Sequence, residues 1–200
     1  MIEDRATRIK KQNAYAKSIL GNAMIIGGMD EALRVRDDLE SVLYAAMGNA
    51  ELSEVFSSQT EDRHERSKSL LDHKKIISNV FAGASEAVIG TLIAMAENND
   101  LDLCAGMYQV YSDLMEEQFD IVVVSVVTAV PLDDHLRDLI SKKAQKEFGK
   151  EIVLHEHVQK EIVGGVILMA KGRIIDCSFL TMTERAKNIL TSIHSYGWTK

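Results

Sequence analysis

The stretch "EIVGGVILMAKGRIIDCSF", residues 161–179, holds the features that decide the fold of this chain. The glycine pair Gly164-Gly165 precedes a short apolar run, and Lys171-Gly172 separates that run from a second one, which ends at Asp176. Glycine permits the positive φ that tight hairpin turns need. The stretch therefore predicts strands over "VILMA" and "RIID", with the turn at Gly172.

The residues before this hairpin predict a small α+β unit. "DIVVVSVVTA" (120–129) is rich in β-branched residues and predicts a strand that ends before Pro131, the only proline. Asp133 is placed to cap a helix that Gly149 ends. One face of this helix carries Leu136, Leu139, Ile140, Ala144 and Phe148. "EIVLHEHV" (151–158) alternates as a strand does, and a last helix is expected at about 180–194.

Residues 1–120 contain no proline and show helical periodicity. The first helix should end at Gly27-Gly28, and Asp30 should cap a second helix that Gly48 closes. Further helices are expected over 50–56, 70–81, 86–98 and 101–119. Ser85 is a plausible cap for helix 86–98, which is apolar nearly all round and is expected to be central. The charged stretch 57–69 is a loop or the solvated start of the fourth helix.

The change of period near residue 120 divides the chain. The sequence predicts an α+β protein with an N-terminal six-helix bundle over residues 1–118 and a small α+β domain over 119–200.

Composition excludes several classes of protein. The formal net charge of -7 argues against a general nucleic-acid binder. No apolar run approaches the roughly 20 residues that span a bilayer. The first eleven residues lack the apolar segment of a signal peptide. Cys104 and Cys177 lie far apart and are expected to be reduced thiols.

Motifs that carry chemistry are missing from the sequence. It has neither a phosphate-binding G-x-x-x-x-G-K-[ST] loop nor a G-x-S-x-G nucleophile motif. Cys104 lies in an apolar helix without a basic neighbour and is expected to be buried and inert. His155 and His157 share one strand face, but no third zinc ligand is evident, which favours an exposed face without metal. We therefore expect no catalytic residue, cofactor or metal, and no enzymatic activity of this chain.

Several segments, taken in order, resemble one family. In the C-terminal half they are "TAVPL" (128–132), Gly149, the run from Val158 through Ile162 to Gly164-Gly165-Val166, and "IDCS" (175–178). In the N-terminal half they are "NAYAKSIL" and "MAEN" (95–98). The order is similar to that of the delta subunit of F-type ATP synthases, whose mitochondrial equivalent is the oligomycin-sensitivity-conferring protein. This chain departs from the family pattern at Gln159, Asp100 and Leu180, where that pattern usually has Asp, Arg and Arg.

The resemblance implies a function. The chain would be a non-catalytic stator subunit that joins the catalytic head to the peripheral stalk and resists rotor torque. The helical bundle would bind the N-terminal segments of alpha subunits, and the C-terminal domain would bind the b subunits. The residues that match the alpha-binding groove are Tyr15, Ala16, Leu20, Met95 and Ala96. The protein would be peripheral, on the cytoplasmic face of the cell inner membrane.

The same resemblance marks a structural signature in the opening stretch. Its members are Gly164, Gly165, Gly172, Asp176 and Ser178, and they are expected to make the fold rather than to carry catalysis. Asp176 is placed to accept from backbone amides at the start of the last helix.

Two other functions stay open from the residues alone. The first is a small enzyme or ligand-binding protein with a pocket between its halves, whose candidate groups would be Cys104, His155 and His157. The second is a soluble helical adaptor unrelated to ATP synthase. From periodicity alone, the apolar stripes of the bundle are explained as core.

Overall fold

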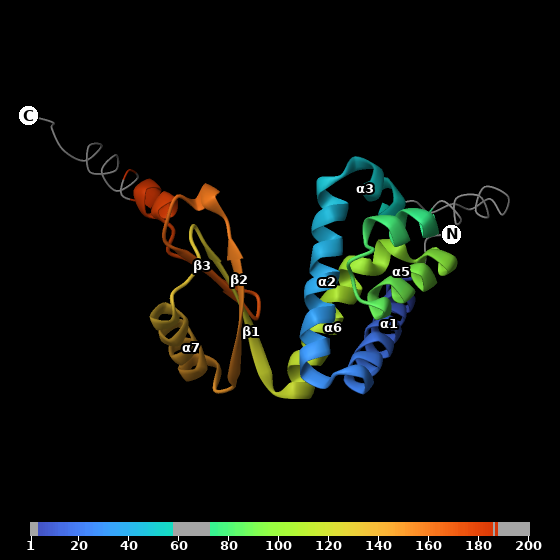
Figure 1. Cartoon of the computed structure of the whole chain (residues 1–200), viewed down its shortest axis with the longest axis horizontal. Coiled ribbons are helices and arrows are strands. Elements are labelled where there is room, and N and C mark those ends of the chain that lie inside the picture. Colours follow the sequence, from blue (N-terminus) through green and yellow to red (C-terminus); the bar gives the residue numbers. More distant parts are fainter. Residues whose placement is uncertain (1–3, 58–72, 186, 188–200) are drawn as a thin grey trace, which may run out of the picture. The chain divides into compact units, whose positions relative to one another are not determined.

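The computed structural model divides into two compact units, Met1–Phe119 and Asp120–Lys200. It describes residues 4–57, 73–185 and 187. The first unit is helical and the second contains the described strands, so the predicted α+β class is confirmed (Figure 1). The charged residues 58–69 and the end of the expected last helix lie outside the described residues.

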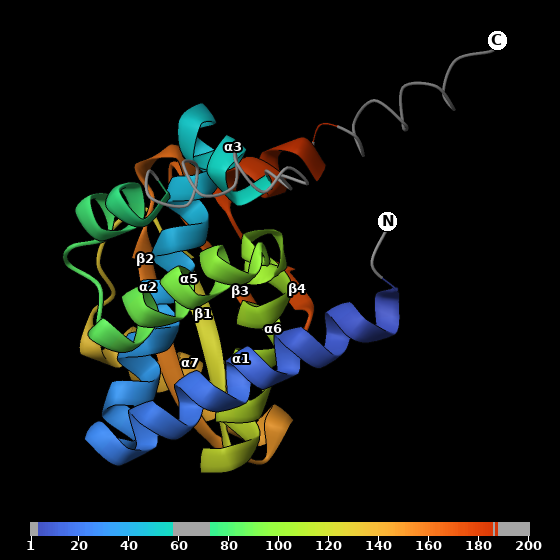
Figure 2. The same ribbon diagram turned by 90° about the vertical axis from the view of Figure 1, so that its right-hand side faces the viewer.

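The helical unit packs α1 against α2 and α6, with α5 beside α1 (Figure 2). Its centre is filled by completely buried side chains, and the Tyr111 hydroxyl donates a 2.8 Å hydrogen bond to the carbonyl of Ala32. The described elements are α1 (Arg5–Ile26), α2 (Gly28–Gly48), α3 (Ala50–Ser57), helical residues 73–80, α5 (Glu86–Asn98), the 3-10 turn η1 (Leu101–Leu103) and α6 (Cys104–Phe119).

Three expectations for the helical unit are wrong in detail. Asp30 does not cap α2, because the helix begins two residues earlier and Gly28 reverses the chain at a φ of +63°. The expected helix over 101–119 starts with the η1 turn. Helix α5 is not enclosed on all sides, since Ile89 and Ile93 remain half-buried and Gly90 is exposed. Composition reports how apolar a helix is, but only packing decides how many sides are covered.

The C-terminal unit contains a four-stranded mixed sheet in the order β2-β1-β3-β4. Strand β1 pairs parallel to β2 and antiparallel to β3, and β3 and β4 form the predicted hairpin. The strands are β1 (Ile121–Thr128), β2 (Glu151–Val158), β3 (Val166–Ala170) and β4 (Arg173–Asp176). The register places Val124 beside Leu154 and Val126 beside Leu168, which keeps these side chains on one face.

Helix α7 (Asp134–Phe148) covers that face, as Figure 1 shows. Asp133 caps it as predicted, with its Oδ1 accepting a 2.7 Å bond from the Leu136 amide, and Gly149 ends it at a φ of +68°. Helix α7 contributes Ile140, Ala144 and Phe148 to a core built on Val122, Val124, Val126 and Leu132.

The glycine pair of the opening stretch has a steric role, as expected. A side chain on Gly165 would place its Cβ 2.4 Å from the carbonyl oxygen of Cys177, and its φ is +86°. A Cβ on Gly164 would lie 2.7 Å from the ring of Phe179. At the tip of the hairpin, Lys171 and Gly172 both adopt positive φ. The glycine pair Gly164-Gly165 therefore lets the chain pass directly beneath the start of the last helix.

Candidate partner-binding surfaces

Among the described residues of the C-terminal unit, part of one sheet face has no helix packed over it. Neighbouring strands lie about 4.8 Å apart and a helix is about 10 Å across, so one helix covers roughly two strands of four. Helix α7 packs over β1 and β2, and beside it opens a cavity of about 740 Å³, here called the α7 groove. Among the residues that line it are Val124, Leu136, Leu139, Val163, Leu168 and Ile175.

The lining of the α7 groove is mostly apolar and its rim is exposed. Leu136 and Leu139 leave 43% and 42% of their surface accessible, and Val163 leaves 75%. Contiguous exposed apolar surface of this kind marks interaction sites in soluble proteins. Thr128, buried at one side of the groove, has a hydroxyl oxygen that makes no hydrogen bond among the described residues.

Ion pairs hold the walls of the α7 groove in place. Arg137 donates from Nε and Nη2 to the two carboxylate oxygens of Glu156 on β2, at 2.6 and 3.1 Å. The hydrogen bond from Arg137 lowers the pKa of Glu156. Across the groove, Arg173 of β4 donates to Glu147 of α7 at 2.6 Å. The groove is thus preformed by α7, which is tied at separate points to β2 and β4.

The start of the last helix closes the C-terminal end of the hairpin. Asp176 accepts from the Ser178 amide at 2.9 Å and from the Thr181 hydroxyl at 2.7 Å. These bonds, led by that from the Ser178 amide, lower the pKa of Asp176. The hydroxyl oxygen of Ser178 in turn accepts from the Thr181 amide at 3.3 Å. Asp176 therefore accepts from one of the backbone amides that it was expected to meet, that of Ser178, and from a hydroxyl.

In the helical unit, four of the five predicted partner residues face the interior. Ala16 and Met95 are completely buried, and Leu20 and Ala96 are nearly so. Tyr15 is half-buried at the surface, where α1 meets the end of α5.

Tyr15 belongs to a polar network that ties α1 to the turn before α6. Its hydroxyl donates to Asp100 Oδ2 at 2.9 Å and accepts from Asn98 Nδ2 at 3.0 Å, while Lys11 Nζ reaches Asp100 Oδ1 at 2.7 Å. Burial, and then the bond to Asp100, raise the pKa of Tyr15 to about 12. Asp100, one of the three residues that depart from the family pattern, is thus the acceptor on which this network converges.

A family model described as the ATP synthase delta (OSCP) subunit matches residues 12–190 of this chain. The chain belongs to this family. As a delta subunit it is a non-catalytic stator component of the F-type ATP synthase. Among the described residues, no helix has both the length and the apolar character needed to cross a membrane.

Curated relatives match this chain along most of its length. The ATP synthase subunit delta of Leuconostoc citreum (strain KM20) is 28% identical over 91% of this chain and 97% of its own length. That of Rhodopirellula baltica (strain DSM 10527 / NCIMB 13988 / SH1) is 25% identical over 88% and 74%. A chain of the Toxoplasma gondii mitochondrial ATP synthase hexamer matches 90% of this chain and 97% of its own length at 17% identity, with a TM-score of 0.48.

The candidate enzymatic groups occupy different settings in this delta subunit. Both cysteines are free thiols, and burial raises the pKa of the Cys104 thiol to about 12, which makes it a poor nucleophile. His155 and His157 are half-buried rather than exposed, and their rings meet edge to face. No residue of the C-terminal partner surface was predicted from the sequence. Leu136 and Leu139, on the apolar face of the predicted helix, are the residues that could have indicated it.

Proposed function

We propose that the C-terminal unit holds the peripheral stalk by accepting the end of a b subunit, as an apolar-faced helix, in the α7 groove. The observation that carries this proposal is the groove itself, which is apolar, open and preformed. Packed helices lie 8–10 Å apart, and the two strands left uncovered by α7 offer about that width. A second helix beside α7 would complete the layer over the sheet, in the helix-in-groove mode of recognition.

Charges at the rim favour one kind of partner. Lys143 and Arg173 line the α7 groove together with Glu147, which is already bonded to Arg173. The excess of positive charge suits a helix that carries carboxylates beside its apolar stripe. A stator contact that resists torque needs durable apolar burial, which the apolar lining of the α7 groove offers.

For the helical unit, we infer a six-helix bundle that binds the N-terminal segments of alpha subunits. The helical residues 73–80 stand where the fourth helix is expected. Tyr15, Ala16, Leu20, Met95 and Ala96 match the family's binding residues. The part of this region that a partner can reach includes Tyr15 and the half-buried Ile89 and Ile93 of α5. Joined to both partners, the subunit would be peripheral to the membrane, on the cytoplasmic face.

The experiment uses Cys177, which is exposed and lines the α7 groove, whereas Cys104 is buried. An environment-sensitive dye on Cys177 of the full chain should report a peptide from the C-terminal end of the b subunit. Leu139→Asp should weaken its binding by about 100-fold or more, because an unpaired carboxylate would lose its water in the apolar groove. Leu180→Asp is the matched control, since Leu180 is also an exposed leucine but lies outside the groove.

Equal affinity of the wild type and Leu139→Asp for the b peptide would place the stalk contact elsewhere. Equal weakening by both substitutions would also contradict the groove, since the effect would then be one of added charge. The alpha-subunit peptide provides a separate arm, because its binding should respond to Tyr15→Asp and Ile93→Asp and not to Leu139→Asp.

A further inference from the structure

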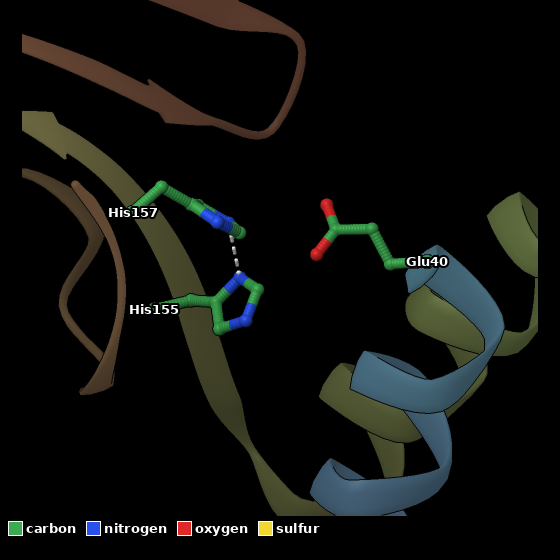
Figure 3. A group of neighbouring side chains, drawn as sticks. All are labelled: Glu40, His155 and His157. Carbon is green, nitrogen blue, oxygen red and sulfur yellow. Dashed lines mark hydrogen bonds between the residues drawn. The ribbon is translucent and has the colours of Figure 1, made fainter. Parts of the chain in front are cut away.

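Two histidine side chains of strand β2 lie in contact with each other. His155 and His157 are alternate residues, so their side chains leave the same side of the strand. The Nε2 atom of His157 lies 2.9 Å from the Nδ1 atom of His155, with the ring centroids 4.2 Å apart (Figure 3). The third side chain drawn in Figure 3, Glu40, belongs to the helical unit and is not a member of the histidine pair.

The pair lies on the sheet face opposite to α7. Ile152 and Leu154, which alternate with the histidines along the strand, pack into the core beneath α7. Side chains alternate between the faces of a strand, so the imidazoles point away from that core. The histidine pair is therefore separate from the α7 groove and from the stalk contact proposed there.

The separation of the two nitrogens matches that of two ligands on one ion. Zinc–imidazole bonds are about 2.0–2.1 Å long. Two such bonds at an angle between 90° and the tetrahedral value place the nitrogens about 2.9–3.4 Å apart. The 2.9 Å contact lies within this range. An ion bound to both nitrogens would lie to one side of the line that joins them, so both rings would turn toward it while the distance between the nitrogens is kept.

The chemistry of the exchange balances without an added reactant. In the neutral pair, one of the two facing nitrogens carries the shared hydrogen and the other accepts it. When a metal binds both facing nitrogens, that proton moves through solvent to the outward nitrogen of the same ring. Each imidazole then stays neutral with one N–H, and water completes the coordination sphere.

We propose that Nδ1 of His155 and Nε2 of His157 form a bidentate site for a borderline divalent transition-metal ion. Imidazole suits Zn²⁺, Cu²⁺ and Ni²⁺, whereas Mg²⁺ and Ca²⁺ prefer oxygen ligands. Affinity should follow the usual order for nitrogen sites, with Cu²⁺ bound more tightly than Ni²⁺ or Zn²⁺. The site goes beyond the stator function and departs from the expectation of no metal that the sequence alone favoured.

The test is calorimetric titration of the tag-free full chain at pH 7.5 with CuCl₂, NiCl₂, ZnCl₂ and MgCl₂. We expect one Cu²⁺ ion to bind per chain at the histidine pair, and we expect Mg²⁺ not to bind. His155→Gln and His157→Gln should each weaken Cu²⁺ binding at least about tenfold, since even the loss of an outer partner of a ligand costs 10–100-fold. His135→Gln, which alters an exposed histidine on α7, is the control and should leave the affinity unchanged.

A second measurement reads the ligands directly. The Cu²⁺ spin-resonance spectrum of the wild type should show coupling to two imidazole nitrogens, and that of either single variant should show one fewer. Failure of Cu²⁺, Ni²⁺ and Zn²⁺ to bind the wild type, or binding that neither His155→Gln nor His157→Gln weakens, would overturn the proposal. Far-ultraviolet circular dichroism of both variants shows whether a loss of binding reflects the site or the fold.

Discussion

The candidate partner residues of the two units of this delta subunit differ in how far their apolar side chains are covered. In the helical unit, the matched residues Ala16 and Met95 are completely buried among neighbouring helices. In the C-terminal unit, Leu136 and Leu139 leave more than two fifths of their surface exposed beside the α7 groove. The sequence shows an apolar helical stripe in both cases. The difference teaches that a stripe marks what must be covered, while the number of elements around it decides whether the chain itself does the covering.

The largest expected effect comes from placing a charge in the buried core of the helical unit. Ala16→Asp should lower the free energy of unfolding of the helical unit by about 3 kcal/mol or more, because a carboxylate would be buried without a partner. Ala14→Asp on the exposed side of α1 should lower it by only about 0.7 kcal/mol, the difference in helix propensity between Ala and Asp. Urea unfolding followed by circular dichroism measures both. A stable Ala16→Asp variant that has lost binding of the alpha peptide would instead assign Ala16 to an open groove.

The next effect concerns the backbone of the C-terminal unit, which contains the α7 groove. Gly165→Ala should cost about 3 kcal/mol, since the new Cβ would both clash with the Cys177 carbonyl and hold an alanine at positive φ. Gly172→Ala provides the matched control. It also has positive φ but meets no atom within 4 Å, so it should cost only about 1 kcal/mol. Equal losses in urea unfolding would show that the hairpin relaxes away from the clash.

A smaller effect tests whether the hydrogen bonds of Tyr15 stabilise the packing of α1 within the helical unit. Tyr15→Phe removes the hydroxyl that donates to Asp100 and should cost about 1 kcal/mol of stability. Tyr15 is one of several tyrosines whose pKa is raised above the ordinary value, so the ultraviolet titration of the variant should contain one late-ionising tyrosine fewer than that of the wild type. An unchanged stability together with weaker binding of the alpha peptide would assign the hydroxyl to the partner rather than to the network.

The smallest effect is a pH dependence at the start of the last helix. The pKa of Asp176 is lower in the folded chain than its unfolded value of about 3.9, so its contribution to stability is present above that value. It is lost as the pH falls through the folded pKa. The difference in melting temperature between the wild type and Asp176→Ala should therefore be constant from pH 7 to 5 and shrink below about pH 4.

Much of the local structure follows from the sequence because its causes are local. Asp133 caps α7, Gly149 ends it, and Lys171-Gly172 turns the hairpin, each through the conformation or hydrogen bonds of a few adjacent residues. Where two local signals compete, prediction fails. Asp30 resembles a cap, but the positive φ of Gly28 lets α2 begin before it.

Contacts between distant segments needed the tertiary structure. The role of Gly165 depends on Cys177, that of Tyr15 on Asp100, and the α7 groove on a helix too narrow for a four-stranded sheet. The convergence of His155 and His157 depends on their side-chain rotamers as well as on the strand that the sequence predicts. The sequence by itself determined most of the described elements and their order, because periodicity and glycine placement act within a few residues, and the resemblance of its ordered segments indicated the family. Only the tertiary structure decided which apolar faces are filled and which stay open, because coverage depends on how many elements pack around each face.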